Sequence, residues 1–200
     1  MTMFVFILLA YLLGSVSFAV IASWLFKLPD PRTYGSKNPG ATNVLRSGKK
    51  AAAILTLLGD AGKGWLAVVL AQYYAPLWGL GGESVAAVAL AVFLGHIFPV
   101  FLRFQGGKGV ATAVGVLLGL SLWVGLLAMA TWVLVAYVWR YSSLSALVAA
   151  TLTPIYTLVI LGLGSSVIAV LLMSLVLVWR HKSNIVNLME GKEGRIGQKS

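Results

Sequence analysis

The chain has 200 residues, of which 60% are hydrophobic and only 10% charged, and its formal net charge is +10. A soluble domain of this length would contain about 25% charged residues, so the composition excludes an ordinary soluble protein. The sequence has no cysteine, which excludes disulfides, thiolate nucleophiles and cysteine-bound metals. The basic residues lie in short segments between apolar runs, so the positive charge indicates membrane topology and anionic ligands rather than nucleic acid.

The apolar runs predict an all-α integral membrane protein, a single domain built as a bundle of seven transmembrane helices. The runs approach the roughly 20 residues that cross a bilayer, and they lack the alternation in segments of about 10 residues that marks a membrane β-barrel. The first run is too long for the core of a signal peptide, so we expect it to be retained. The expected helices cover about residues 3–26, 51–74, 84–102, 109–121, 122–139, 143–162 and 165–180.

The run from Val110 to Val138 decides between seven spans and six. It is too long for one comfortable span, and two spans require short or tilted helices with a turn near residues 119–121. Lysine and arginine follow the first, third, fifth and seventh expected helices, whereas the connections near 75–84, 119–122 and 162–166 have neither. The positive-inside rule then places the N-terminus outside and the C-terminus in the cytoplasm. With six spans, Arg140 or the tail would lie on the wrong side.

The first polar segment follows the first expected helix and contains no acidic residue between Pro31 and Gly59. Its glycines and asparagines permit unusual backbone angles, and its hydroxyl, amide and cationic groups offer many hydrogen-bond donors. We predict that it binds phosphate; the alternative is a solvated connector. The candidate residues are Ser36, Lys37, Asn38, Gly40, Thr42, Asn43 and Arg46.

The second expected helix carries an ionisable pair, Asp60 and Lys63, spaced one helical turn apart. Ionisable groups inside a span are costly and by default indicate function. The pair could instead fix the positions of two helices. If Gly64 to Leu80 is itself the span, the pair lies at the cytoplasmic interface, beside the site.

The turn Gly106-Gly107-Lys108-Gly109 opens the next expected helix. Free N–H groups at a helix N-terminus, together with a lysine, form an anion site. The spacing is not that of a nucleotide-binding P-loop. His96, near the end of the preceding helix, could contact a substrate or hydrogen-bond a backbone carbonyl.

Two further polar clusters follow the fifth and seventh expected helices. Arg140, Ser142 and Ser145 could cap a helix or contact a ligand. The last cluster contains His181, Asn184 and Glu193 in addition to its basic residues, so it is more than a signal of membrane topology.

The sequence contains no recognisable nucleophile motif, and its few carboxylates suit neither a two-carboxylate mechanism nor a magnesium cage. These features favour an enzyme that binds phosphates and positions an already activated donor.

Three of these segments resemble the signature regions of the bacterial acyl-phosphate:glycerol-3-phosphate acyltransferases, the PlsY family. The first is Gly35–Asn43 with Arg46, and the second is Gly95–Val100 with Gly106–Gly109. The third is Arg180–His181 with Asn184 and Gly191–Glu193. The resemblance covers essentially the whole chain, including the number of spans and their orientation.

The resemblance implies acyl transfer from acyl phosphate to the 1-hydroxyl of sn-glycerol 3-phosphate, which gives lysophosphatidate and inorganic phosphate in bacterial phospholipid synthesis. It also implies a multi-pass protein of the cytoplasmic (inner) membrane, surrounded by lipid, with a cytoplasm-facing site and with no metal, cofactor or obligate protein partner.

Under this hypothesis, Ser36 and Lys108 with its glycines hold the acyl-phosphate group. Glycerol 3-phosphate is held by Thr42, Arg46, Ser145, His181 and Asn184, whereas Asp60, Lys63 and Glu193 brace the site. The general base could be His96, His181 or the departing phosphate.

Two other functions fit a basic helical bundle. A transporter of a small phosphorylated or anionic solute would place its site near the midplane, often between internal repeats. A membrane scaffold would not need so many glycine turns on one side. Here the polar clusters lie on one face and no repeat is evident, so we favour the enzyme.

Overall fold

The computed structural model describes residues 1–197, and over this range the chain is helical without strands. Two short 3-10 turns, Ala75–Trp78 and Val100–Leu102, follow the fourth and fifth α-helices. The α-helices are α1 (Thr2–Ser15), α2 (Phe18–Leu25), α3 (Ala41–Leu45), α4 (Lys50–Tyr74), α5 (Gly82–Ile97), α6 (Val110–Leu120), α7 (Leu122–Trp139), α8 (Ser142–Leu161), α9 (Ser165–Arg180) and α10 (Lys182–Met189).

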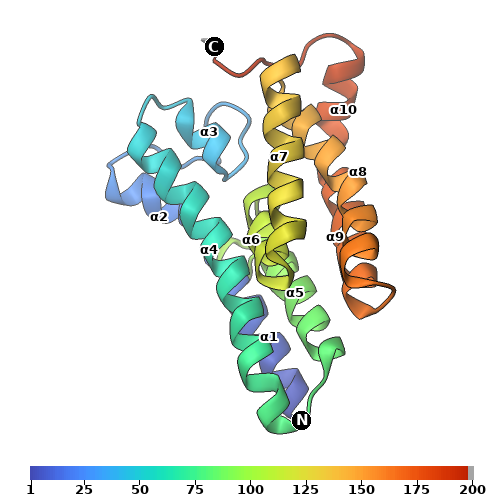
Figure 1. Cartoon of the computed structure of the whole chain (residues 1–200). Coiled ribbons are helices and arrows are strands. Elements are labelled where there is room, and N and C mark those ends of the chain that lie inside the picture. The colour runs from blue at the N-terminus through green and yellow to red at the C-terminus, as the bar shows by residue number, and fades with distance from the viewer. Residues whose placement is uncertain (198–200) are drawn as a thin grey trace.

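The first apolar run differs from the single helix expected over 3–26, because it is interrupted after Ser15. Val16 is extended at φ −71° and ψ 120°. The Ser17 hydroxyl then accepts a hydrogen bond from the Val20 N–H at 3.4 Å and so begins α2 as its N-cap. Helix α2 leaves the axis of α1 and lies beside α3 and the first turns of α4 (Figure 1). The remaining long helices begin and end within a few residues of the expected bounds, except α5, which ends at Ile97.

Helices long and apolar enough to cross a membrane make up most of the bundle. Five such segments occur among the described residues, Thr2–Leu25, Lys50–Trp78, Gly82–Leu102, Leu122–Trp139 and Ser142–Leu161. Helices α9 and α10, bent by 57°, make a sixth if they form one broken span. Helix α6 has only 11 residues, or about 16 Å at 1.5 Å per residue, about half of a hydrocarbon core.

Close backbone contacts fix the helices of the core to one another. A Cβ atom added to Gly115 of α6 would lie 1.8 Å from the Ala61 carbonyl oxygen of α4, and one added to Gly64 would lie 2.5 Å from that of Thr112. Such contacts require glycine, as is usual where membrane helices pack closely. Helix α4 therefore holds the N-terminal half of α6 in place.

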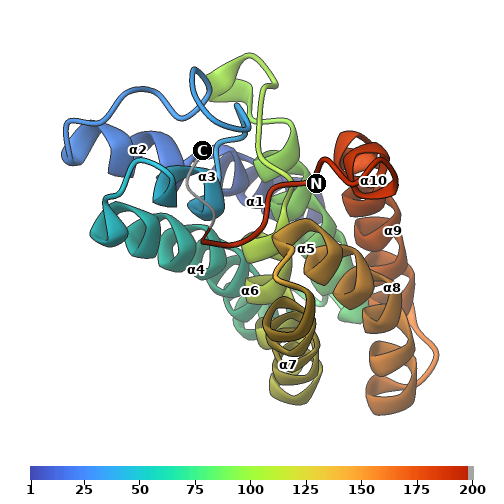
Figure 2. The ribbon, with the colours of Figure 1, turned by 90° about the horizontal axis from the view of Figure 1, so that it is seen from above.

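The two termini lie at opposite ends of the bundle, and α2, α3, α10 and the C-terminal tail gather at the end opposite Met1 (Figure 1). Seen from above, the tail runs from α10 across the bundle toward α3 and α4 (Figure 2). The polar segments that the sequence singles out thus converge from distant parts of the chain.

Candidate active site

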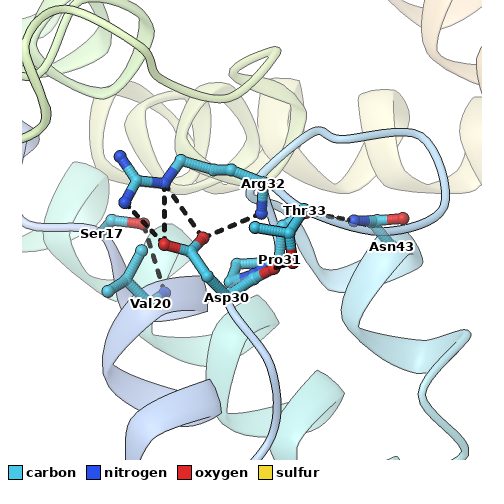
Figure 3. Close-up of polar contacts among 7 residues, drawn as sticks. All are labelled: Ser17, Val20, Asp30, Pro31, Arg32, Thr33 and Asn43. Atoms are coloured by element: carbon cyan, nitrogen blue, oxygen red, sulfur yellow. Dashed lines mark hydrogen bonds and ion pairs between the residues drawn. The ribbon is translucent and has the colours of Figure 1, made fainter.

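The loop that leads into α3 begins with a charged turn (Figure 3). The Asp30 carboxylate accepts hydrogen bonds from the Arg32 guanidinium at 2.6 Å and from the Arg32 N–H at 2.9 Å. Hydrogen bonding to Arg32 lowers the pKa of Asp30, and the same contact raises that of Arg32. The Thr33 hydroxyl donates to the Asp30 carbonyl at 2.8 Å. This turn sets the direction in which the loop approaches the bundle.

Asn43 holds the rest of this loop in shape. Its side chain is 2% exposed, and its amide nitrogen donates to the carbonyls of Pro31 at 2.7 Å and Tyr34 at 3.2 Å. Its amide oxygen accepts the Ser36 N–H at 2.9 Å. The sequence predicted that Asn43 binds substrate, but in the structure its amide is used within the loop.

The other candidates of this loop and of α3 have solvent-accessible side chains. The side chains of Ser36, Lys37, Thr42 and Arg46 are exposed. The Thr42 hydroxyl lies 3.4 Å from that of Ser142, so the loop reaches the start of α8. Asn38 and Gly40 shape the approach to α3, because a Cβ on Gly40 would lie 2.9 Å from the Asn38 amide nitrogen.

The glycine turn before α6 is held from two sides. The Arg180 guanidinium donates to the carbonyls of Gly106 at 3.0 Å and Gly107 at 3.3 Å. On the other side the Gly107 N–H donates to the His96 carbonyl at 3.2 Å. Cβ atoms on Gly106 and Gly107 would lie 2.1 Å from the His96 carbonyl oxygen and 2.2 Å from its Nε2. The turn therefore has no room for side chains beside His96.

Gly109 ends this turn at φ +87°, a conformation that favours glycine, and serves as the N-cap of α6. The first N–H groups of a helix lack intrahelical acceptors, and the helix dipole is positive there. These N–H groups and the neighbouring lysine are the features from which the sequence predicts an anion site, and they lie side by side at the start of α6.

Lys108 is joined to the C-terminal tail by a chain of hydrogen bonds. Its Nζ donates to the Asn184 amide oxygen at 2.5 Å, and the Asn184 amide nitrogen donates to Glu193 Oε1 at 2.7 Å. The Ser143 hydroxyl donates to the same Glu193 oxygen at 2.6 Å. Burial lowers the pKa of Lys108, while the Glu193 charge opposes that shift. The predicted candidates Lys108, Asn184 and Glu193 are therefore direct neighbours.

His181 lies just beyond α9, at the bend before α10. Its Nδ1 lies 2.8 Å from the Leu177 carbonyl oxygen. A carbonyl can only accept, so Nδ1 carries the proton and Nε2 keeps its lone pair. Burial lowers the pKa of His181 to about 4, so the ring is neutral near pH 7. A neutral imidazole of this tautomer can accept a proton from a hydroxyl group.

The serines at the start of α8 differ from the prediction. Ser145 is fully buried and donates to the Tyr141 carbonyl at 2.7 Å, inside its own helix. The predicted substrate contact of Ser145 thus gives way to a local helix bond. Ser143, which belongs to the same hydroxyl cluster but was not chosen as a site residue, reaches the Lys108 network instead, and Ser142 faces Thr42.

Arg140, which was expected to cap a helix or contact a ligand, binds the tail at the neighbouring position. Its guanidinium donates to the Ile196 carbonyl at 3.1 Å, and its own carbonyl accepts the Ile196 N–H at 2.6 Å. Arg195 donates to the Tyr141 hydroxyl at 3.2 Å. A Cβ on Gly194 would lie 3.6 Å from the Arg46 guanidinium, so the tail passes between α8 and the α3 loop.

Asp60, Lys63 and His96 lie behind the glycine turn as a buried group. They are 2%, 3% and 7% exposed. The sequence makes His96 a catalytic candidate, and in the structure its ring packs against the backbone of the turn. His96 therefore limits the position of the turn.

The assembled site combines cations, free helix N–H groups and a neutral histidine. Arg180, which the sequence placed in the third signature segment without a role of its own, belongs to it through its bonds to the glycine turn. Within residues 1–197, no three histidine, aspartate or glutamate side chains come together as a metal site would require. A narrow apolar cavity of about 40 Å³ adjoins the turn, lined by Val110, Leu117, Trp132, Met173 and neighbouring side chains of α6–α9.

Comparisons with known proteins show which proteins this chain resembles. The model of a family described as glycerol-3-phosphate acyltransferase matches residues 4–191. The chain is similar to a glycerol-3-phosphate acyltransferase of Nitrosospira multiformis, 66% identical over 100% of this chain and 99% of the relative. A relative of the same name from Nitrosomonas europaea is 63% identical over 98% of each chain.

Solved structures show the same likeness. The chain is similar to the crystal structure of PlsY, an integral membrane glycerol 3-phosphate acyltransferase, in its glycerol 3-phosphate form. The TM-score is 0.91 at 33% identity, covering 98% of this chain and 96% of the other. The lysophosphatidic acid form gives 0.89 at 32% identity with the same coverage.

Proposed function

The chain belongs to the glycerol-3-phosphate acyltransferase family, and from this premise we propose its reaction, its donor and its orientation in the membrane. It is an integral membrane acyltransferase that acylates the 1-hydroxyl of sn-glycerol 3-phosphate and gives lysophosphatidate. The acyl donor is an acyl phosphate, which releases inorganic phosphate. One observation carries the choice of donor, namely the anion-binding turn at the start of α6 with Lys108 beside it.

The donor phosphate binds at this turn. The N–H groups at the start of α6 and the Lys108 ammonium neutralise its charge, and Arg180 adds positive charge while it holds the turn in place. The carbonyl end of the acyl chain lies near Val110, where the small apolar cavity begins, and the rest of the chain lies among the helices or in the surrounding lipid. Because the carbonyl of a mixed anhydride is already electrophilic, the protein needs no nucleophile of its own.

Glycerol 3-phosphate binds on the side of the α3 loop. Arg46 holds its phosphate, Thr42 donates a hydrogen bond and Lys37 adds positive charge, whereas Ser36 is assigned to the donor phosphate. His181 faces the hydroxyl that reacts. Asn184, which the resemblance assigns to glycerol 3-phosphate, bonds Lys108 in the structure, so we assign it the role of positioning Lys108 toward the donor, with Glu193 and Ser143 fixing Asn184.

In the reaction, the 1-hydroxyl oxygen attacks the acyl carbonyl carbon. A carbon–oxygen bond forms as the bond to the phosphate oxygen breaks, and the phosphate leaves with that electron pair. The hydroxyl proton passes to His181 Nε2 or to the departing phosphate. His181→Gln separates the two routes, because only the first requires an imidazole and loses turnover while glycerol 3-phosphate binding persists.

The bundle crosses the bacterial inner membrane seven times, with its N-terminus outside and its site facing the cytoplasm. Two observations support this. The termini lie at opposite ends of the bundle, as an odd number of crossings requires (Figure 1). Lysine and arginine are absent from the connections at residues 75–81, 121 and 162–164, as expected of the outer side.

The rival function is transport of a phosphorylated solute. Proteoliposomes supplied with palmitoyl phosphate and radiolabelled glycerol 3-phosphate distinguish the two. We expect the label in lysophosphatidate within the lipid fraction, only when palmitoyl phosphate is present. Label that accumulates unchanged in the vesicle lumen, with or without palmitoyl phosphate, would favour the transporter.

A further inference from the structure

The buried ionic group behind the glycine turn joins three separate parts of the chain. Lys63 Nζ lies 2.9 Å from Asp60 Oδ1, and His96 Nδ1 lies 3.5 Å from the same oxygen. Lys63 Nζ also donates to the Val16 carbonyl at 2.6 Å, at the point where α1 ends and α2 has not begun. One carboxylate on α4 thus connects α5 with the break between α1 and α2.

His96 and Lys63 each contact a segment that leads to a proposed phosphate-binding part of the site. His96 presents Nε2 to Gly107 and its backbone carbonyl to Gly106, so its position limits where the turn before Lys108 can lie. Val16 precedes α2, which leads into the loop carrying Arg46. These segments pack closely around the group, and the space bordered by Val16, Lys63, His96 and Gly107 leaves no room for a water molecule.

The location of the group argues against a purely structural ion pair. Removing two charges from water costs more than their attraction commonly returns, so apolar residues of similar size would stabilise the helices as well or better. The group nevertheless lies where α4 meets both the turn before α6 and the break before α2. Asp60 and Lys63 are both buried, so neither side chain is exposed toward the site.

We propose that Asp60 is a positioning residue for catalysis, acting through His96 on the Gly106–Gly109 turn and through Lys63 on the break before α2. The proposal rests on the proposed function of this site. Asp60 does not contact either substrate. It fixes the distance between the two phosphate-binding segments, so its loss misplaces the donor carbonyl relative to the acceptor hydroxyl.

Replacement of the ion pair by apolar residues tests this role. In Asp60→Leu/Lys63→Met no charge is left unpaired, so the helices are expected to remain folded, with a melting temperature in detergent near that of the wild type. The kcat for phosphate release from palmitoyl phosphate should fall about 10- to 100-fold, as expected when reacting groups are misplaced by about 1 Å. A wild-type kcat in this variant would overturn the proposal.

A second variant decides the question if the first does not fold. Asp60→Asn keeps an oxygen that can accept from Lys63 and His96, and it should fold with a smaller loss of kcat. A folded Asp60→Asn protein with wild-type kcat would equally contradict the proposal. Glu83→Gln is the control, because it removes an exposed carboxylate at the opposite end of α5 and should leave kcat unchanged.

Binding of inorganic phosphate separates this proposal from the proposed function. If the wild-type protein releases no phosphate from palmitoyl phosphate, the donor assignment fails. The positioning role is then tested by the thermal shift that inorganic phosphate produces. We expect a shift in the wild type that is reduced in both variants; equal shifts in all three proteins would overturn the positioning role.

Discussion

The two ends of the bundle use glycine differently. At the end without lysine or arginine, Gly79, Gly81, Gly82, Gly162 and Gly164 have open space where a Cβ atom would lie. At the other end, the glycines of the loop before α3 and of the turn before α6 are crowded, since Cβ atoms on Gly35, Gly40, Gly106, Gly107 and Gly109 would lie less than 3 Å from a neighbouring atom. Gly48 and Gly191, outside these two segments, have open space. The first set allows the chain to turn, whereas the second brings polar backbone against other segments. Shape is therefore specified much more tightly where the phosphates are proposed to bind.

The largest effect should come from the one lysine within the glycine turn. Lys108→Met removes the cation beside the donor phosphate, and we expect a loss of about 100- to 1000-fold in the rate of phosphate release, as for removal of a transition-state donor. Lys50→Met, at an exposed position of α4, is the matched control and should act like the wild type. Equal rates in the two variants would remove the turn from the site.

A pair of alanine substitutions compares the two ends directly. Gly107→Ala places a methyl group against His96 and should slow the reaction about 10- to 100-fold by moving the turn. Gly164→Ala, in the open connection between α8 and α9, should change neither rate nor melting temperature. Comparable losses in both variants would contradict the distinction between the ends.

Arg46→Gln tests whether the site has two separate phosphate positions. Because Arg46 is proposed to hold glycerol 3-phosphate, its loss should raise the KM for that substrate about 10-fold, with kcat changed less than about two-fold. Steady-state kinetics at fixed palmitoyl phosphate measure both. The control is Lys49→Gln, which removes an exposed cation at the same end of the bundle and should leave KM and kcat unchanged. An unaltered KM in Arg46→Gln would refute the assignment of Arg46 to glycerol 3-phosphate.

The smallest effect concerns pH. Burial lowers the pKa of His181 to about 4, so its ring is already neutral at pH 6. A rise in pH above 6 therefore does not increase the fraction of neutral imidazole that can accept a proton. The pH profile of kcat should therefore show no protonation step near 6.5 that depends on His181. Between pH 6.5 and 4 the unfolded chain binds the imidazole proton more readily, so this group lowers stability as the pH falls through that window. A step near 6.5 that disappears in His181→Gln would contradict the assignment.

Much of the helical architecture could be predicted, because long apolar runs bounded by glycine and basic residues specify membrane helices. The break after Ser15 could not, because the apolar run continues across it and the only local signal was the N-cap Ser17. Likewise α3 is a five-residue helix held by tertiary contacts, in a segment that otherwise has the composition of a loop.

The candidate site could be predicted as a set of segments, but the role of each side chain could not. The lysine turn and the tail residues were found because their chemistry is unusual in an apolar chain. Ser143, and not Ser145, bonds Glu193 of the tail, which depends on the side of α8 that faces the tail. Asn43 has the composition of a ligand residue, yet its amide is used within its own loop. Arg180 was part of the third signature segment, but its bonds to the glycine turn depend on the fold, which brings the end of α9 beside the start of α6.

The stoichiometry of the reaction catalysed by the purified protein tests the proposed donor most directly. Inorganic phosphate and lysophosphatidate should be measured together, with palmitoyl phosphate as the donor and with glycerol 3-phosphate present or omitted. We expect equal amounts of both products when glycerol 3-phosphate is present, and neither when it is omitted. Phosphate released at the same rate without glycerol 3-phosphate, or without matching lysophosphatidate, would contradict this expectation.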